Sequence, residues 1–218
     1  MTDEVVLAVN HWASNAHLIL DVHRLGYLRD DDRVVDVTYG RGTFWKLWRP
    51  GTLDTHDFAI DGVDFRRLPY DPATSDAVVA DPPYVATGGR ETTTMPEFAD
   101  RYGMKDAPRT PAALNQLILE GMVEWKRVVR PGGYVLIKSA TYVSSGRLYA
   151  GTFHIQVAAE ALGLELVDQL HHYAVPRPQP VRTRKDGSPV RQLHARNNYS
   201  TLSIFKRRGR KSARVKTP

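Results

Sequence analysis

Short apolar runs alternate along this chain with longer segments in which apolar residues recur at helical spacing. The runs predict buried strands, and the spacing of three or four residues predicts amphipathic helices. We expect strands at residues 33–38, 77–80, 134–138, 164–167 and 200–205, and helices at residues 10–25, 110–129 and 152–162. This alternation is typical of an α/β protein with a mostly parallel sheet. The last two strands have no predicted helix between them and are expected to form an antiparallel hairpin.

The helix at residues 110–129 has the clearest local signals. Thr110 is a favourable N-cap, and Pro111 suits the first helical position. The apolar face comprises Leu114, Leu117, Ile118, Met122, Trp125 and Val129. Its spacing predicts a helix that packs on the core rather than one that binds a ligand. The segment Pro131-Gly132-Gly133 then breaks the chain before the next strand.

The tetrapeptide Asp81-Pro82-Pro83-Tyr84 directly follows the apolar run at residues 77–80. Because open α/β sheets bind ligands at the carboxyl ends of their strands, Asp81 is expected at a ligand-binding edge. The two prolines fix φ and lack amide hydrogens, so nearby carbonyls can act as acceptors. The Asp81 carboxylate and the Pro82 carbonyl could accept the two hydrogens of an exocyclic amine, and Tyr84 could stack on a flipped base. The alternative is a proline-rich turn that closes an ordinary core strand.

A glycine-rich turn follows the first predicted strand, about 40 residues before the tetrapeptide. It extends from Tyr39 to Trp45 and contains Gly40 and Gly42, which let a backbone approach a ligand closely. The dinucleotide-binding pattern requires a third glycine at position 45, where this chain has Trp45. A nicotinamide or flavin cofactor is therefore disfavoured.

Together, the tetrapeptide and the turn resemble the motifs of the S-adenosylmethionine-dependent amino-methyltransferases of nucleic acids. The resemblance extends over roughly residues 33–206. It implies a single-domain, Rossmann-like α/β fold with a mostly parallel seven-stranded sheet and a C-terminal antiparallel strand. It also implies that Asp81, Pro82, Pro83 and Tyr84 are the catalytic residues.

The same resemblance implies S-adenosylmethionine as cofactor. Asp36 would lie near the ammonium group of the cofactor, and the glycine-rich turn would wrap the methionine part. Asp57, at the end of a plausible second strand, would hold the ribose hydroxyls, with Asp54 as the alternative. Asp64 and the backbone of Phe65 would meet the adenine ring, although both Asp57 and Asp64 could instead be solvated loop carboxylates. The cofactor-binding residues implied are Asp36, Thr38, Tyr39, Gly40, Gly42, Asp57, Asp64 and Phe65.

The form of the tetrapeptide bears on the target. In the family that the chain resembles, Asp-Pro-Pro-Tyr is commoner among enzymes that methylate the 6-amino group of adenine, so adenine in DNA is the expected target. The 4-amino group of cytosine and the 2-amino group of guanine in RNA remain alternatives. A protein glutamine amide also fits the chemistry, and a binding module that has lost activity is the alternative outside catalysis.

Charge is distributed unevenly along the chain. Residues 176–218 carry 13 Lys and Arg against the single acid Asp186, a net charge of +12 within a total of +6. This asymmetry predicts a polyanionic partner, DNA or RNA, and argues against a protein substrate. The candidate phosphate-binding residues are Arg90, Arg101, Arg182, Arg184, Lys185, Arg191 and Arg196.

These patterns predict one methyltransferase domain at residues 1–205 and a basic tail at residues 206–218. Within the domain, residues 85–110 are expected to form a lid or target-contacting loop, and residues 176–198 a basic excursion between the last two strands. A disordered insertion and a functionless tail are the alternatives.

Several absences complete the picture from the sequence. The chain has no cysteine, which excludes the thiol nucleophile needed to methylate carbon 5 of a pyrimidine. It shows no basic leader and no apolar run approaching membrane-spanning length, so we expect a cytoplasmic protein without membrane or protein partners. The histidines form no recognisable metal set. Lys138 could face the target or lie on the surface, and Trp12 could cover the cofactor or pack in the core.

Overall fold

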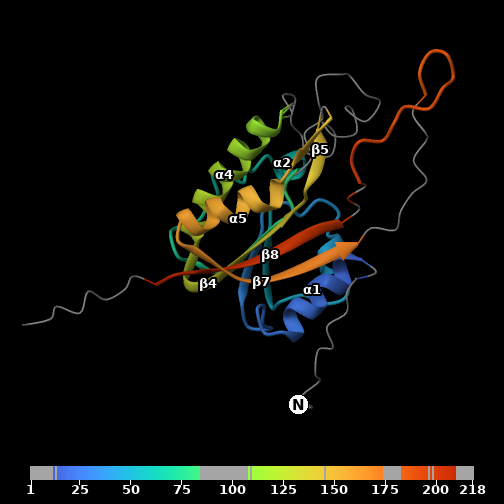
Figure 1. The fold of residues 1–218 in the computed structure, drawn as a ribbon. Helices are drawn as coiled ribbons and strands as arrows, with labels where there is room; N and C mark the ends of the chain where they lie inside the picture. The colour runs from blue at the N-terminus through green and yellow to red at the C-terminus, as the bar shows by residue number, and fades with distance from the viewer. Residues whose placement is uncertain are drawn as a thin grey trace, which may run out of the picture.

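The computed structural model describes residues 12, 14–83, 108, 110–144, 146–173, 183–195, 197 and 199–209. Its centre is a mixed sheet with the strand order β2-β1-β3-β4-β8-β7. The strands are β1 (Arg33–Asp36), β2 (Thr52–Thr55), β3 (Ser75–Ala80), β4 (Val129–Ser139), β7 (Leu164–Tyr173) and β8 (Tyr199–Arg207). The first four pair in parallel, and β8 pairs antiparallel with β4 and β7 (Figure 1). The sequence thus predicted the fold class and the antiparallel strand correctly.

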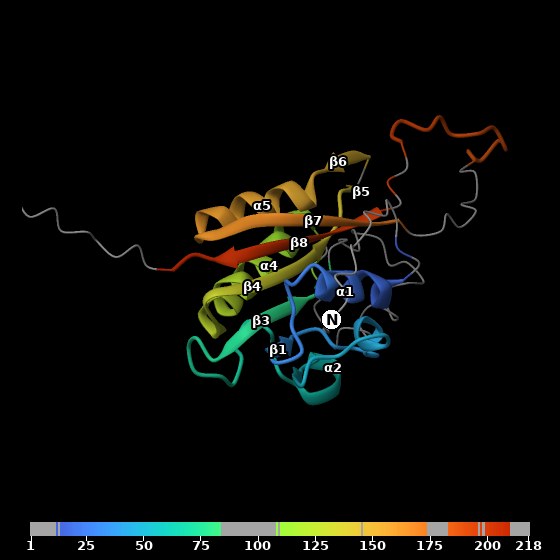
Figure 2. The same ribbon diagram turned by 90° about the horizontal axis from the view of Figure 1, so that it is seen from below.

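Helices cover both faces of this sheet. They are α1 (Asn15–Arg24), α2 (Phe58–Asp61), α4 (Pro111–Val128) and α5 (Gly151–Ala161), with a 3₁₀ turn η1 (Thr43–Trp45). Figure 2 shows α4 and α5 together on one side of the sheet and α1 on the other. A separate hairpin pairs β5 (Tyr142–Ser144) with β6 (Arg147–Tyr149).

The side chains of each central strand pack alternately into two hydrophobic cores, because successive side chains point to opposite faces of the sheet. Val35 and Val78 pack into the core under α4 and α5, which includes Trp125. Val34 and Val79 pack into the core under α1 and η1. All four valines are at most 1% exposed, which explains why these strands read as continuous apolar runs in the sequence.

Several boundaries differ from the sequence-based predictions. The first helix begins at Asn15 rather than residue 10, because the Ser14 side chain caps it by accepting the His17 amide hydrogen. The first strand ends at Asp36, where its carboxylate turns the chain by accepting the Thr38 amide hydrogen. Within the described residues the main sheet has six strands rather than seven. The stretch between β2 and β3 holds the four-residue α2 and no further strand.

The last strand runs to Arg207, two residues into the predicted tail. The Arg207 side chain anchors this end of the strand, because its guanidinium donates to the backbone carbonyls of Arg127 and Val129. Arg208 forms ion pairs with Glu160 at 3.1 Å and Glu165 at 3.4 Å. The first basic residues of the expected tail are therefore part of the folded domain. The rest of the tail from residue 210, the lid at residues 85–107 and residues 176–182 lie outside the described residues.

Candidate functional site

The carboxyl ends of three parallel strands form one edge of the sheet. Asp36 ends β1, Asp81 follows β3 directly, and Lys138 lies near the end of β4. The register places Asp36 beside Val79 and Ala80 beside Ile137, so the three ionisable side chains come from neighbouring strand ends. The sequence predicted Asp81 at a ligand-binding edge, and the resemblance placed Asp36 near the cofactor.

Asp36 is buried and fully engaged by neutral donors. One carboxylate oxygen accepts the Thr38 amide hydrogen at 2.9 Å, and the other accepts the indole N–H of Trp45 at 2.7 Å. Burial raises the pKa of Asp36 to about 7, against the lowering effect of these two hydrogen bonds, and the nearby Asp81 and Asp57 raise it further. A dinucleotide-binding loop would have its third glycine at position 45. In this chain that position holds Trp45, which donates a hydrogen bond to Asp36. No local pattern in the sequence indicated that role.

The glycine-rich turn has the backbone conformation that its glycines suggested. Gly40 has a φ of 53° and Gly42 a φ of 63°, both in the left-handed region. The Gly40 amide donates to Asp57 Oδ2 at 3.0 Å. A Cβ atom at Gly42 would lie 2.6 Å from the hydroxyl oxygen of Tyr39, so a side chain there would have to displace the Tyr39 ring.

Asp57 links this turn to α2. The strand β2 ends at Thr55, so Asp57 is not a strand-end residue as predicted; it is the N-cap of α2 and accepts the Ala59 amide hydrogen at 2.9 Å. Asp54, the alternative, points to Arg33 and pairs with it at 2.8 Å. The carboxylate beside the glycine-rich turn is therefore Asp57.

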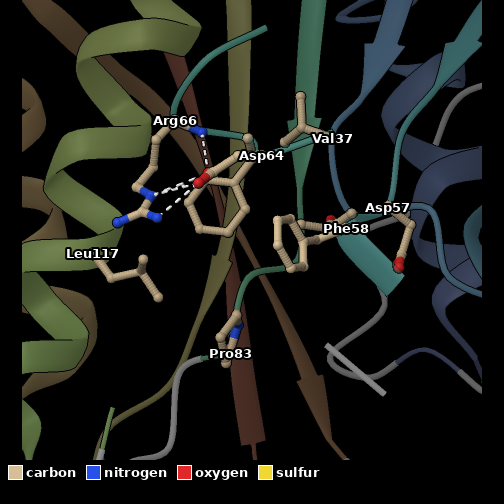
Figure 3. Close-up of a pocket in the computed structure, with 9 residues that line it drawn as sticks. Val37, Asp57, Phe58, Asp64, Arg66, Pro83 and Leu117 are labelled. Atoms are coloured by element: carbon tan, nitrogen blue, oxygen red, sulfur yellow. Dashed lines mark hydrogen bonds and ion pairs between the residues drawn. The ribbon is translucent and has the colours of Figure 1, made fainter. Parts of the chain in front are cut away.

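A pocket opens beside these residues, between β1, α2 and α4 (Figure 3). Its lining residues are Val37, Thr38, Asp57, Phe58, Asp64, Phe65, Arg66, Pro83 and Leu117. The pocket thus brings together four predicted cofactor-binding residues with one residue of the tetrapeptide. Val37, Phe58, Arg66 and Leu117 were not predicted as site residues. An aromatic residue directly after Asp57 was the available signal for Phe58.

Arg66 forms several hydrogen bonds with Asp64 in the pocket wall (Figure 3). Its guanidinium donates to both carboxylate oxygens of Asp64, with the shortest contact at 2.6 Å, and its backbone amide donates at 2.9 Å. Burial alone would raise the pKa of Asp64, but the hydrogen bonds from Arg66 outweigh it and hold the pKa below its usual value. Asp64 is therefore an ionised acceptor in the pocket wall, in an irregular segment and with 31% of its side chain exposed.

The tetrapeptide is tied to the glycine-rich turn. The Asp81 amide donates to Thr38 Oγ1 at 2.7 Å, and Pro82 and Pro83 are buried. Asp81 Oδ2 lies 3.4 Å from Lys138 Nζ. Lys138 is only 4% exposed, so the expectation that it lies on the surface is wrong. Tyr84 lies outside the described residues.

Two further sequence-based expectations concern the edges of the site. Trp12 donates its indole N–H to Asp21 at 2.7 Å and packs against the core on the α1 side, in agreement with the core interpretation. Of the candidate phosphate-binding residues, Arg184, Lys185 and Arg191 are exposed in the segment 183–195, which extends away from the sheet in Figure 1. Arg90, Arg101, Arg182 and Arg196 lie outside the described residues.

Comparison with known proteins relates the chain to methyltransferase structures. No protein-family model and no curated sequence matches it. A chain of the complex between the Haloferax volcanii Trm112 methyltransferase activator and a candidate methyltransferase is similar, with a TM-score of 0.53 and 16% identity over 92% of this chain and 90% of that chain. This likeness shows a shared fold.

Two further structures are less similar. The N-methyltransferase NodS of Bradyrhizobium japonicum has a TM-score of 0.48 and 13% identity, over 88% of this chain and 95% of that chain. A candidate DNA modification methylase of Thermus thermophilus, in complex with S-adenosyl-L-methionine, has a TM-score of 0.45 and 15% identity over 81% of this chain. The match spans 56% of the Thermus protein, about half its length. Structures similar to this chain thus include S-adenosylmethionine-dependent methyltransferases.

The described part of the chain contains neither a candidate membrane-spanning helix nor a candidate metal site. No helix there has the length and apolar character needed to cross a membrane. The same residues contain no group of three or more His, Cys, Asp or Glu side chains arranged to hold a metal ion.

Proposed function

We propose that this protein is an S-adenosylmethionine-dependent amino-methyltransferase that acts on the 6-amino group of adenine in DNA. The observation that carries the proposal is the hydrogen bond between the Asp81 amide and Thr38 Oγ1, 2.7 Å long. It joins the segment that suits an exocyclic amine to the glycine-rich turn that suits the cofactor. The pocket beside them is lined by Thr38 and Pro83 from these two segments.

The residues of the pocket fit the cofactor. Asp57 and Asp64 supply carboxylate oxygens, which suit the donors of a ribose diol and an adenine amino group. Phe58 and Leu117 supply apolar surface for a planar ring. The left-handed Gly40 and Gly42 shape the turn that would surround the methionine part. When bound, S-adenosylmethionine supplies an activated methyl group on a cationic sulfonium.

The protein's own residues act on the amine. An aromatic amine is a weak nucleophile because its lone pair is delocalised into the ring. Acceptors on its two hydrogens favour a pyramidal nitrogen with a localised lone pair, and the Asp81 carboxylate and the Pro82 carbonyl are suited to that role. Asp81 is also suited to accept the proton that the nitrogen loses. The cost of flipping a base, a few kcal/mol, would be offset in part by stacking on Tyr84.

The choice of adenine in DNA rests on the sequence of the tetrapeptide, and the choice of nucleic acid rests on the basic carboxyl end. Arg184, Lys185 and Arg191 are exposed and would contact phosphates without reading sequence. That no protein partner is needed stays a prediction, since the similar Haloferax volcanii structure is a complex with an activator.

The test is transfer of a labelled methyl group to separate substrates. The purified protein is incubated with labelled S-adenosylmethionine and adenine-rich duplex DNA, cytosine-rich duplex DNA, structured RNA or a glutamine-containing protein. Label in N6-methyladenine supports the proposal. Label confined to 4-methylcytosine, to RNA or to protein overturns the adenine assignment and retains amino-methyl transfer, and cofactor binding without any transfer indicates an inactive binding module.

A further inference from the structure

Lys138 is a buried cation at the proposed catalytic edge, and the proposed transfer does not use it. It lies near the end of β4, with 4% of its surface exposed. Burial of an ammonium group is costly unless polar partners compensate for the lost water. The partners here are specific, because Nζ donates to Asn15 Oδ1 at 2.9 Å and lies 3.4 Å from Asp81 Oδ2.

Two other elements fix the position of this ammonium group. Asn15 is the first residue of α1, which packs on the sheet through the core under that helix. Phe44, in η1, places its ring centroid 5.6 Å from Nζ, within the range of a cation–π contact. Lys138 is thus held by α1 and η1. Its ammonium group faces the Asp81 carboxylate, whose side chain is 28% exposed.

We propose that Lys138 is a positioning residue that holds the Asp81 carboxylate in one orientation, and in its ionised form, for hydrogen bonding to the amine. The proposal rests on the proposed function for the identity of that amine. A fixed cation 3.4 Å from Asp81 Oδ2 narrows the range of rotamers that the carboxylate samples, and misplacement of a catalytic group by about 1 Å can cost a hundredfold in rate. A neighbouring cation also favours the charged form, which accepts hydrogen bonds and does not donate them.

Other ionisable groups surround this pair among the described residues. On the β1 side, Asp36 is influenced by the charges of Asp81 and Asp57. On the β7 side, burial lowers the pKa of His172, and the charge of Lys138 lowers it further. The charge of Lys138 thus acts on Asp81 on one side and on His172 on the other.

A double-mutant cycle on thermal unfolding tests the contact without any activity measurement. Asp81→Asn leaves the Lys138 ammonium with less compensation and should lower the melting temperature by roughly 5 °C. Adding Lys138→Met removes the buried charge, so the double variant should recover most of that loss. Lys126→Met on α4, combined with Asp81→Asn, is the matched control and should give additive effects. If Lys138→Met does not fold, Lys138→Gln takes its place in the cycle, since its amide still donates.

A kinetic measurement tests the consequence for Asp81. Lys138→Met should lower kcat on the methyl acceptor by about tenfold or more with little change in KM. The acidic limb of its pH–rate profile should move to higher pH, because a carboxylate without its cation is protonated more easily. His172 should titrate at higher pH in the same variant, which NMR can follow.

Additive stability effects, together with a wild-type kcat and pH profile, would overturn the positioning role. Failure of the proposed function has a different signature: wild-type protein would methylate no nucleic acid, while the stability cycle would still report the pairing of Lys138 with Asp81.

Discussion

The hydroxyl of Thr38 accepts the backbone N–H of Asp81 at 2.7 Å, so the glycine-rich turn and the segment that begins at Asp81 are parts of one hydrogen-bonded unit. Thr38→Val keeps the shape of the side chain but leaves this amide without its acceptor. We expect a loss of about 1–3 kcal/mol in unfolding free energy and a lower turnover. Thr38→Ser retains the hydroxyl and serves as the control. Equal stability and turnover in the Val and Ser variants would show that the contact is dispensable.

Gly42 provides a sharper test than Gly40 of the proposal that the glycine-rich turn binds the cofactor. A Cβ at Gly42 would lie 2.6 Å from the Tyr39 hydroxyl oxygen, whereas at Gly40 the nearest atom is 3.7 Å away. Gly42→Ala should therefore abolish or strongly weaken binding of S-adenosylmethionine, measured by calorimetry. Gly132→Ala is the matched control, because Gly132 also has a positive φ, of 84°, but has no atom within 4 Å of the added Cβ. Unchanged affinity in a folded Gly42→Ala protein would place the cofactor elsewhere.

Asp36 gives the protein a specific pH dependence. Burial raises its pKa from 3.8 to about 7, so the folded protein holds this proton more tightly than the unfolded chain. The resulting stabilisation is fully present below about pH 4 and is lost as the pH rises through about 7. The pKa of Asp64 is lowered by Arg66 despite burial, so Asp64 stabilises the folded protein at higher pH. That contribution is lost as the pH falls, in a range below that of Asp36.

We therefore expect the unfolding free energy of the ligand-free protein to decline between about pH 4 and pH 7. The Asp36→Asn variant has no proton to lose there, and its unfolding free energy should not show that part of the decline. Denaturant titrations at several pH values measure both curves. Parallel curves for the two proteins would mean that Asp36 is ionised throughout.

The carboxyl-terminal tail should be shortened after Gly209 rather than after Phe205. Arg207 and Arg208 contact the folded domain, and their removal would confound binding with stability. Deletion of residues 210–218 removes four basic residues, Arg210, Lys211, Arg214 and Lys216. DNA affinity should fall for all sequences, and the logarithmic salt slope should flatten by about 0.9 for each phosphate that the tail neutralises. Identical slopes for the full and shortened proteins would exclude a role for the tail in binding DNA.

The strands of the sheet and the helix α4 could be predicted because their signals are local. Buried valines at 34, 35, 78 and 79 give continuous apolar runs, and Thr110 caps α4 as predicted, with its hydroxyl accepting from Ala113. The register that brings Asp81 beside Lys138 is a tertiary property. A lysine at a strand end looks the same in sequence whether it is exposed or buried, and only the placement of Asn15 and Phe44 decides between them.

Only part of the candidate site could be predicted, because some of its features are local in the sequence and others depend on the tertiary structure. Gly40 and Gly42 carry a backbone requirement that sequence can reveal, and both have the expected positive φ. The role of Trp45 depends on the 3₁₀ turn folding back over Asp36, nine residues earlier. Asp57 caps a helix of four residues, too short to leave a periodic signal in the sequence.

The central claim is that Asp81 takes part in methyl transfer to adenine. The direct measurement is single-turnover transfer of labelled methyl from S-adenosylmethionine to unmethylated duplex DNA, with nucleosides separated by mass spectrometry, for wild-type protein and for Asp81→Ala. Melting curves and cofactor affinity of the variant are measured alongside, because the buried Lys138 is expected to lower its stability. The account predicts N6-methyladenine from the wild-type protein and a rate lower by about a hundredfold or more from a folded, cofactor-binding variant. Equal rates for the two proteins, or no methylated adenine from the wild type, would contradict it.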